Sequence, residues 1–94
     1  MVSMATNQPK IILYGKERCQ LCEEAKISLQ LLCEAHGLSF EEFDIYSDSV
    51  VLERYQLKIP VLTIDGEEIS SGYLSYRDTE QALVSYIKNN RTHS

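Results

Sequence analysis

The chain has 94 residues, of which 44% are apolar and 24% are charged, so it can form one domain with its own hydrophobic core. Its net charge of −5 argues against binding to nucleic acid or to anionic membranes. No apolar segment approaches the length of a membrane span, and the first ten residues lack the pattern of a signal peptide. We therefore expect a cytoplasmic, monomeric protein without a nucleic-acid or membrane partner.

The first half of the chain predicts a strand, a helix and a second strand. Residues 10–14 are β-branched and apolar, which is typical of a buried strand. Residues 21–36 have a helical period that ends at Gly37. The apolar face predicted for this helix consists of Leu21, Ala25, Leu29, Leu32 and Cys33. Residues 38–45 predict the second strand, and the slip in its alternation at Glu41 and Glu42 suggests a bulge there.

The second half predicts a short helix, a hairpin and a last helix. Residues 47–57 favour a helix capped by Ser47 or Ser49. Strands are predicted for residues 60–65 and 67–70, because Asp-Gly at positions 65 and 66 is a strong hairpin signal. The stretch "SYRD" resembles a capping box that begins at Ser75, ahead of a helix to about Lys88.

The predicted order of elements is β-α-β-α-β-β-α. A βαβ unit gives a parallel pair of strands and the hairpin gives an antiparallel pair, so one four-stranded mixed sheet flanked by helices is the compact solution. The fold class is therefore α/β. We expect a disordered leader over residues 1–9, a single domain over residues 10–88, and a frayed tail over residues 89–94.

The stretch "KERCQLCE" holds two cysteines that could be a metal clip, a redox couple or merely two neighbouring thiols. Cys19 is predicted in the loop that enters the first helix, where backbone N–H groups and the helix dipole lower the pKa of a thiol. Cys22 is predicted one turn inside the helix. In a redox couple, Cys19 would attack a disulfide and Cys22 would resolve the mixed disulfide.

Two other readings of the cysteines have less support. A closed zinc site needs four ligands, and His36 and His93 are predicted far from the pair, so we expect no metal. Cys33 would lie about 16 Å from Cys22 along the helix, too far for a disulfide, and is expected in the core.

The segments "LYGKERCQLCEEA" and "KIPVLTIDGEE", in this order of elements, resemble the glutaredoxin branch of the thioredoxin-fold proteins, in particular the small glutaredoxin-like proteins. The resemblance covers residues 10–88. It implies a thioredoxin-like fold and thiol–disulfide oxidoreductase activity, with Cys19 and Cys22 as the catalytic residues. It also implies a cis proline at Pro60 against the redox pair, a backbone at Ile59 that binds an extended thiol substrate, and a substrate-binding role for Lys16.

Some residues depart from the family pattern. Gln20 and Leu21 replace the common Pro-Tyr, and "SSGYLS" offers only Gly72 where the family has Gly-Gly and a following Asp that help to hold glutathione. Glutathione is therefore a less secure reductant than the dithiol chemistry itself, and no bound cofactor is expected. The expected partner is a disulfide-containing protein or a glutathione mixed disulfide. The alternative function is a non-enzymatic thioredoxin-fold binding module, or a carrier of metal or of an iron–sulfur cluster.

Overall fold

The computed structural model describes residues 8–91, so the predictions for residues 1–7 and 92–94 lie outside the described residues. Within residues 8–91, four strands and three α-helices follow one another in the predicted order, and a short 3-10 helix that was not predicted lies before the second α-helix. Their bounds are β1 Ile11–Gly15, α1 Gln20–His36, β2 Phe40–Asp44, η2 Ile45–Ser47, α2 Ser49–Tyr55, β3 Val61–Ile64, β4 Glu67–Ser71 and α3 Tyr76–Arg91. None of the helices in this part of the chain has the length and apolar character needed to cross a bilayer.

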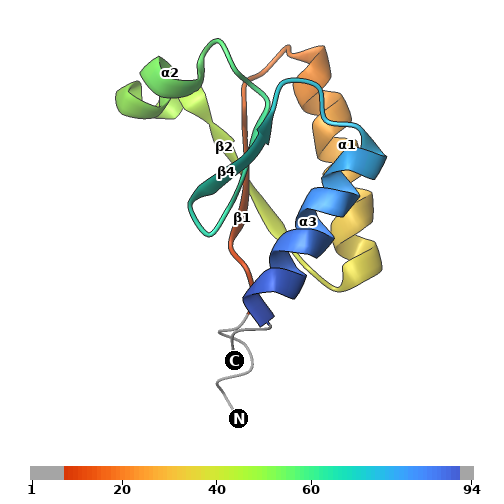
Figure 1. Ribbon diagram of the computed structural model, residues 1–94. Helices are drawn as coiled ribbons and strands as arrows, with labels where there is room; N and C mark the ends of the chain where they lie inside the picture. The colour runs from red at the N-terminus through yellow and green to blue at the C-terminus, as the bar shows by residue number, and fades with distance from the viewer. Residues whose placement is uncertain (1–7, 92–94) are drawn as a thin grey trace.

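The four strands form one mixed sheet in the order β2-β1-β3-β4. β1 is parallel to β2, while β3 is antiparallel to both β1 and β4. The register aligns Phe43, Tyr14, Val61 and Ser71 in one row across the sheet. The segments that follow β1, precede β3 and follow β4 therefore leave the sheet at the same end, the upper end in Figure 1.

The helices lie on both sides of the sheet (Figure 1): α1 and α3 pack side by side, and α2 lies on the opposite side. The larger hydrophobic cluster joins the sheet to α1 and α3, and its buried residues are Ile11, Leu13, Ala25, Leu29, Leu32, Cys33, Leu62, Ile64, Leu74 and Leu83. The smaller cluster consists of Ile45, Tyr55 and Val61, with Tyr14 packed against it. Each large apolar side chain buried in this way stabilises the fold by about 1.5–3 kcal/mol.

Two of the predicted stop and turn signals are confirmed by the backbone. Gly37 ends α1 in the left-handed region, with φ 68°, a conformation that costs glycine little. Asp65 and Gly66 connect β3 to β4 with φ values of 54° and 84°, as a two-residue hairpin turn with both central residues left-handed requires.

The bulge predicted in the second strand is wrong. β2 pairs with β1 in an unbroken register through Glu41 and Glu42. The irregularity lies instead between β3 and β4, where Ile69 is the extra residue. Both glutamates are exposed because β2 is an edge strand, and they form ion pairs with Lys10 and Lys26. The break in the alternation of apolar and polar residues is therefore explained by the solvent exposure of an edge strand and not by a bulge.

The ends of α2 and α3 differ in part from the predictions. The N-cap of α2 is Asp48, not Ser47 or Ser49: its Oδ1 accepts hydrogen bonds from the backbone N–H groups of residues 50 and 51 at 2.9 and 3.2 Å. For α3 the predicted cap is confirmed, because Ser75 Oγ accepts a hydrogen bond from the Asp78 N–H at 3.1 Å. α3 continues to Arg91, beyond the predicted end at Lys88.

Candidate functional site

Cys19 and Cys22 form a disulfide at the start of α1. Cys19 is the N-cap residue, with an extended backbone, and its Sγ accepts a hydrogen bond from the Cys22 N–H at 3.2 Å. Cys22 lies in the first turn and is only 7% exposed, whereas Cys19 is half-buried. The predicted positions of both cysteines are therefore confirmed, and Cys19 is the more accessible of the two.

The buried face of α1 contains Cys22 in place of Leu21, which we expected there. Leu21 is 43% exposed. Because the helix begins directly after Cys19, Cys22 faces the sheet and contacts Gly15 at the end of β1. A Cβ atom placed on Gly15 would lie 3.1 Å from Cys22 Sγ and 3.2 Å from Cys22 Cβ, so glycine permits this close approach. The sequence pattern gave Gly15 no role in the site, although it directly follows the predicted strand of residues 10–14.

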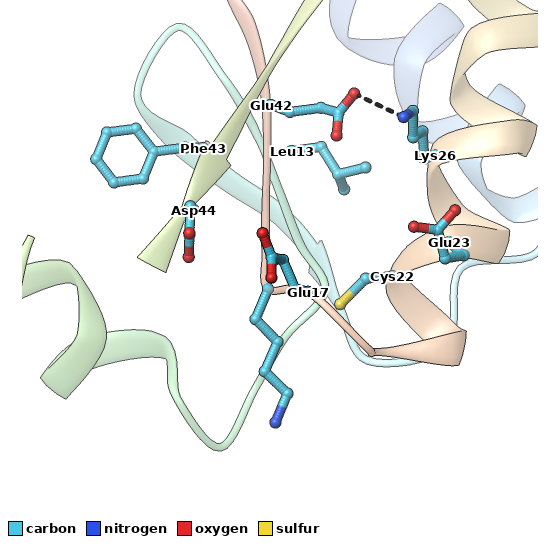
Figure 2. Close-up of a pocket in the computed structure, with 10 residues that line it drawn as sticks. Leu13, Glu17, Cys22, Glu23, Lys26, Glu42, Phe43 and Asp44 are labelled. Atoms are coloured by element: carbon cyan, nitrogen blue, oxygen red, sulfur yellow. Dashed lines mark ion pairs between the residues drawn. The ribbon is translucent and has the colours of Figure 1, made fainter. Parts of the chain in front are cut away.

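A cavity of about 270 Å³ opens beside the disulfide, with Cys22 in its wall. Figure 2 shows the Cys22 sulfur pointing into this space from the start of α1. The remaining lining residues come from β1, α1, β2 and the loop between β1 and α1, and they are Leu13, Gly15, Lys16, Glu17, Glu23, Lys26, Glu42, Phe43 and Asp44. Lys26 and Glu42 form an ion pair across the cavity at 3.2 Å. The buried cysteine thus has a polar opening toward solvent.

Pro60 and Ile59 reach the same end of the sheet. The Ile59–Pro60 peptide bond is cis, as the family resemblance implies. Pro60 is buried, and the register that pairs Tyr14 with Val61 puts Pro60 opposite Gly15, the residue that contacts Cys22. The structure therefore brings the predicted proline to the end of β1 where the disulfide lies.

One of the two backbone polar groups of Ile59 already has a hydrogen-bond partner. Its N–H donates a hydrogen bond to the Tyr55 carbonyl at 3.1 Å, while no hydrogen bond among the described residues ends at the Ile59 carbonyl. The resemblance implies that this backbone binds an extended substrate. In this geometry the Ile59 carbonyl is the backbone group of this residue that can still accept a hydrogen bond.

Charges of both signs surround Cys19. Lys16, Glu17 and Arg18 are exposed in the loop before it, and Arg18 has a left-handed backbone with φ 57°. Glu23 follows in the first turn of α1. Because the cysteines are joined in a disulfide, the lowered pKa of the Cys19 thiol stays a prediction for the reduced protein.

Two other residues considered from the sequence lie away from the disulfide, and His93 lies outside the described residues. Cys33 is a free thiol in the core, only 3% exposed, and burial raises its pKa. His36 Nε2 lies 3.7 Å from a Glu80 carboxylate oxygen of α3, which places it in a helix-to-helix contact. Over residues 8–91, no group of three or more His, Cys, Asp and Glu side chains is arranged to hold a metal ion.

Comparison with known families gives one match. The model of the glutaredoxin-like domain (DUF836) matches residues 10–88, which is most of the chain and includes the disulfide and Pro60. No curated protein is similar enough in sequence to count as a match.

Solved structures with the same fold are numerous. A protein from Nitrosomonas europaea, solved by NMR, is 26% identical with a TM-score of 0.70, and the match covers 84% of this chain and 91% of that one. A protein from X. campestris is 24% identical with a TM-score of 0.69, over 80% of this chain and 96% of that one. Thioredoxin 1 from Thermosipho africanus is 15% identical with a TM-score of 0.66, over 87% of this chain and 98% of that one. The fold is therefore thioredoxin-like, as predicted.

Proposed function

We propose that this chain, which belongs to the glutaredoxin-like domain family, is a thiol–disulfide oxidoreductase that uses Cys19 and Cys22. The observation that carries the proposal is the hydrogen bond from the Cys22 N–H to Cys19 Sγ at the N-cap of α1. A donor in that place stabilises a thiolate over a thiol, and the thiolate is the nucleophile in disulfide exchange. The disulfide between the two cysteines is the oxidised form of the proposed dithiol–disulfide couple.

The proposed reaction has two exchange steps. In the reduced protein the Cys19 thiolate attacks a substrate disulfide, so that a Cys19–substrate disulfide forms and the other substrate sulfur leaves as a thiolate that takes up a proton. Cys22 then loses its proton and attacks Cys19 Sγ, and the second substrate sulfur leaves in the same way. The substrate gains two electrons, and the protein ends as the Cys19–Cys22 disulfide.

Three further residues have proposed roles in binding the substrate. The Ile59 carbonyl would accept a backbone hydrogen bond from an extended substrate, beside Pro60. Lys16 lines the cavity next to Cys22 and adds positive charge near the attacking sulfur. The proposed substrate is a protein disulfide or a glutathione mixed disulfide, and a cytoplasmic thiol compound would return the protein to its dithiol form.

The first test is a redox titration with trapping. Wild-type protein is equilibrated in glutathione buffers, alkylated and weighed by mass spectrometry. We expect one two-electron midpoint in the range of roughly −200 to −270 mV found for glutaredoxins and thioredoxin, with Cys33 alkylated only after unfolding. In turnover with a small disulfide, Cys19→Ser abolishes activity and Cys22→Ser accumulates a mixed disulfide on Cys19, while Cys33→Ala is the control and stays active.

Retained activity in Cys19→Ser would refute the assignment of the nucleophile. A pair that never interconverts between dithiol and disulfide at cellular potentials would refute the enzyme and favour the binding-module alternative.

A further inference from the structure

The end of the sheet that bears the disulfide exposes several large apolar side chains. Leu57, in the segment before Pro60, is 94% exposed, and Tyr73, in the loop between β4 and α3, is 68% exposed. These are the two most exposed large apolar residues of the described chain. Leu21 of α1 and Tyr76 of α3 are 43% and 41% exposed. We call these four residues the apolar rim.

Backbone hydrogen bonds hold the two loops of the rim together. The Gly72 N–H donates to the carbonyls of Lys58 and Pro60 at 3.0 and 2.9 Å. Leu57 and Tyr73 are the chain neighbours of this hydrogen-bonded pair, Lys58 and Gly72. Both loops leave the sheet at the end where the segment after β1 carries Cys19 (Figure 1). Leu57 and Tyr73 therefore lie on loops of fixed position at the end of the sheet that bears the disulfide.

The same loops offer few groups that could bind carboxylates. The N–H groups of Ile59 and Gly72 are already bonded to carbonyls of the chain. The Lys58 ammonium lies 2.8 and 3.0 Å from the two carboxylate oxygens of Glu68, so its charge is neutralised. Ser75 Oγ already caps α3 through the Asp78 N–H.

The charges beside Cys19 also disfavour an anionic substrate. Lys16 and Arg18 are opposed by Glu17, Glu23 and Glu24, all of them exposed. Carboxylates therefore outnumber cations in this segment. Glutathione carries more carboxylates than amino groups, so it gains no net attraction here.

We infer that the surface formed by the apolar rim and Cys19 binds an extended polypeptide disulfide with apolar side chains next to its cysteine, in preference to glutathione. This inference rests on the proposed exchange reaction. The substrate's apolar side chains would cover Leu57 and Tyr73, and a backbone N–H beside its cysteine would donate to the Ile59 carbonyl. The Cys19 thiolate then forms the mixed disulfide, and the displaced sulfur leaves as a thiolate and is protonated.

The test compares three disulfides with the same reduced protein. Two are blocked, uncharged peptide dimers linked by one disulfide, with Leu-Cys-Phe or Ser-Cys-Asn at the centre, and the third is oxidised glutathione. Second-order rate constants for reduction are divided by those measured with dithiothreitol, which removes differences in intrinsic reactivity. We expect the Leu-Cys-Phe dimer to react about tenfold faster than either of the others, a ratio that corresponds to about 1.4 kcal/mol.

Two double variants locate the preference. Leu57→Ser with Tyr73→Ser removes exposed side chains of the rim, and we expect it to lose most of the tenfold preference. Ile27→Ser with Leu31→Ser is the matched control, because these residues of α1 are 58% and 52% exposed and lie one to three turns beyond the cysteines. The control is expected to keep the preference, and both variants are expected to keep the wild-type redox midpoint.

The outcomes distinguish a failure of the substrate preference from a failure of the proposed exchange reaction. Equal normalised rates for all three disulfides, faster reaction of oxidised glutathione, or an unchanged preference in the rim variant would overturn this inference and leave the exchange reaction standing. If the wild-type protein reduces none of the disulfides that dithiothreitol reduces, the proposed function itself is wrong, and this inference falls with it.

Discussion

At the scale of single residues, Gly15 determines how closely Cys22 approaches the sheet. Gly15→Ala puts a methyl group 3.1 Å from Cys22 Sγ, and Cys22 cannot move freely because it is bonded to Cys19. The substitution also restricts the unfolded chain, which favours folding by about 0.4–1 kcal/mol. Overpacking costs about 1–3 kcal/mol and is the larger effect. We expect the oxidised variant to lose about 1 kcal/mol of unfolding free energy, measured by urea denaturation.

The matched control for Gly15→Ala is the same substitution in the reduced protein. Without the disulfide, Cys22 Sγ can rotate away from the added methyl group although Cys22 Cβ stays close to it, so the loss of stability is expected to be smaller. An oxidised Gly15→Ala protein as stable as wild type would contradict the close packing of Cys22 on β1.

At the scale of elements, the start of α2 has an aspartate as its N-cap, although the sequence offers neighbouring serines as equally good caps. Asp48 accepts hydrogen bonds from two backbone N–H groups of the first turn. Asp48→Ala is therefore expected to cost about 1 kcal/mol of unfolding free energy, the usual value of an N-cap. Ser49→Ala removes a neighbouring residue of capping type that lies inside the helix, and we expect a change below about 0.5 kcal/mol. Urea denaturation of both variants measures the difference.

A larger loss in Ser49→Ala than in Asp48→Ala would contradict this assignment of the cap. The sequence could not settle the question because Ser47, Asp48 and Ser49 are all good capping residues. Only the backbone of Asp48, with φ −149° and ψ 119°, identifies the last residue before the helix.

At the scale of the whole molecule, Cys33 links the stability of the core to pH. It is buried in the cluster that joins the sheet to α1 and α3, and this burial raises its pKa above that of an unfolded thiol. The native state therefore keeps its proton at pH values where the unfolded state loses one. The stability that Cys33 contributes is complete below about pH 8.5, the ordinary pKa of a thiol, and is lost as the pH rises through the raised value.

Urea denaturation at pH 7 and pH 10 checks this prediction in the oxidised protein. The wild-type free energy of unfolding is expected to fall between the two pH values by more than that of Cys33→Ala, which has no thiol to ionise. An equal fall in both proteins would show that the Cys33 thiol does not contribute to the pH dependence.

Much of the fold follows from local patterns in the sequence. The order of elements, the stop of α1 at Gly37 and the hairpin at Asp65 and Gly66 each depend on residues within one or two turns of one another. The same is true of the site. A thiol placed directly before a helix lies close to the N–H groups of the first turn, so the sequence could place Cys19, and not Cys22, at the N-terminal end of the helix.

Contacts between distant segments decided the rest. Because β1 lies between β2 and β3 in the sheet, Gly15 meets Cys22 on one side and lies opposite Pro60 on another. The hydrogen bonds from Ile59 to Tyr55 and from Gly72 to Lys58 then determine which backbone groups of these loops already have a partner within the chain. The sequence by itself determined the place of the cysteine pair at the start of the first helix and the order of the elements, since these are local. Only the tertiary structure decided what surrounds the pair, because that depends on strand pairing and on how loops far apart in the chain pack together.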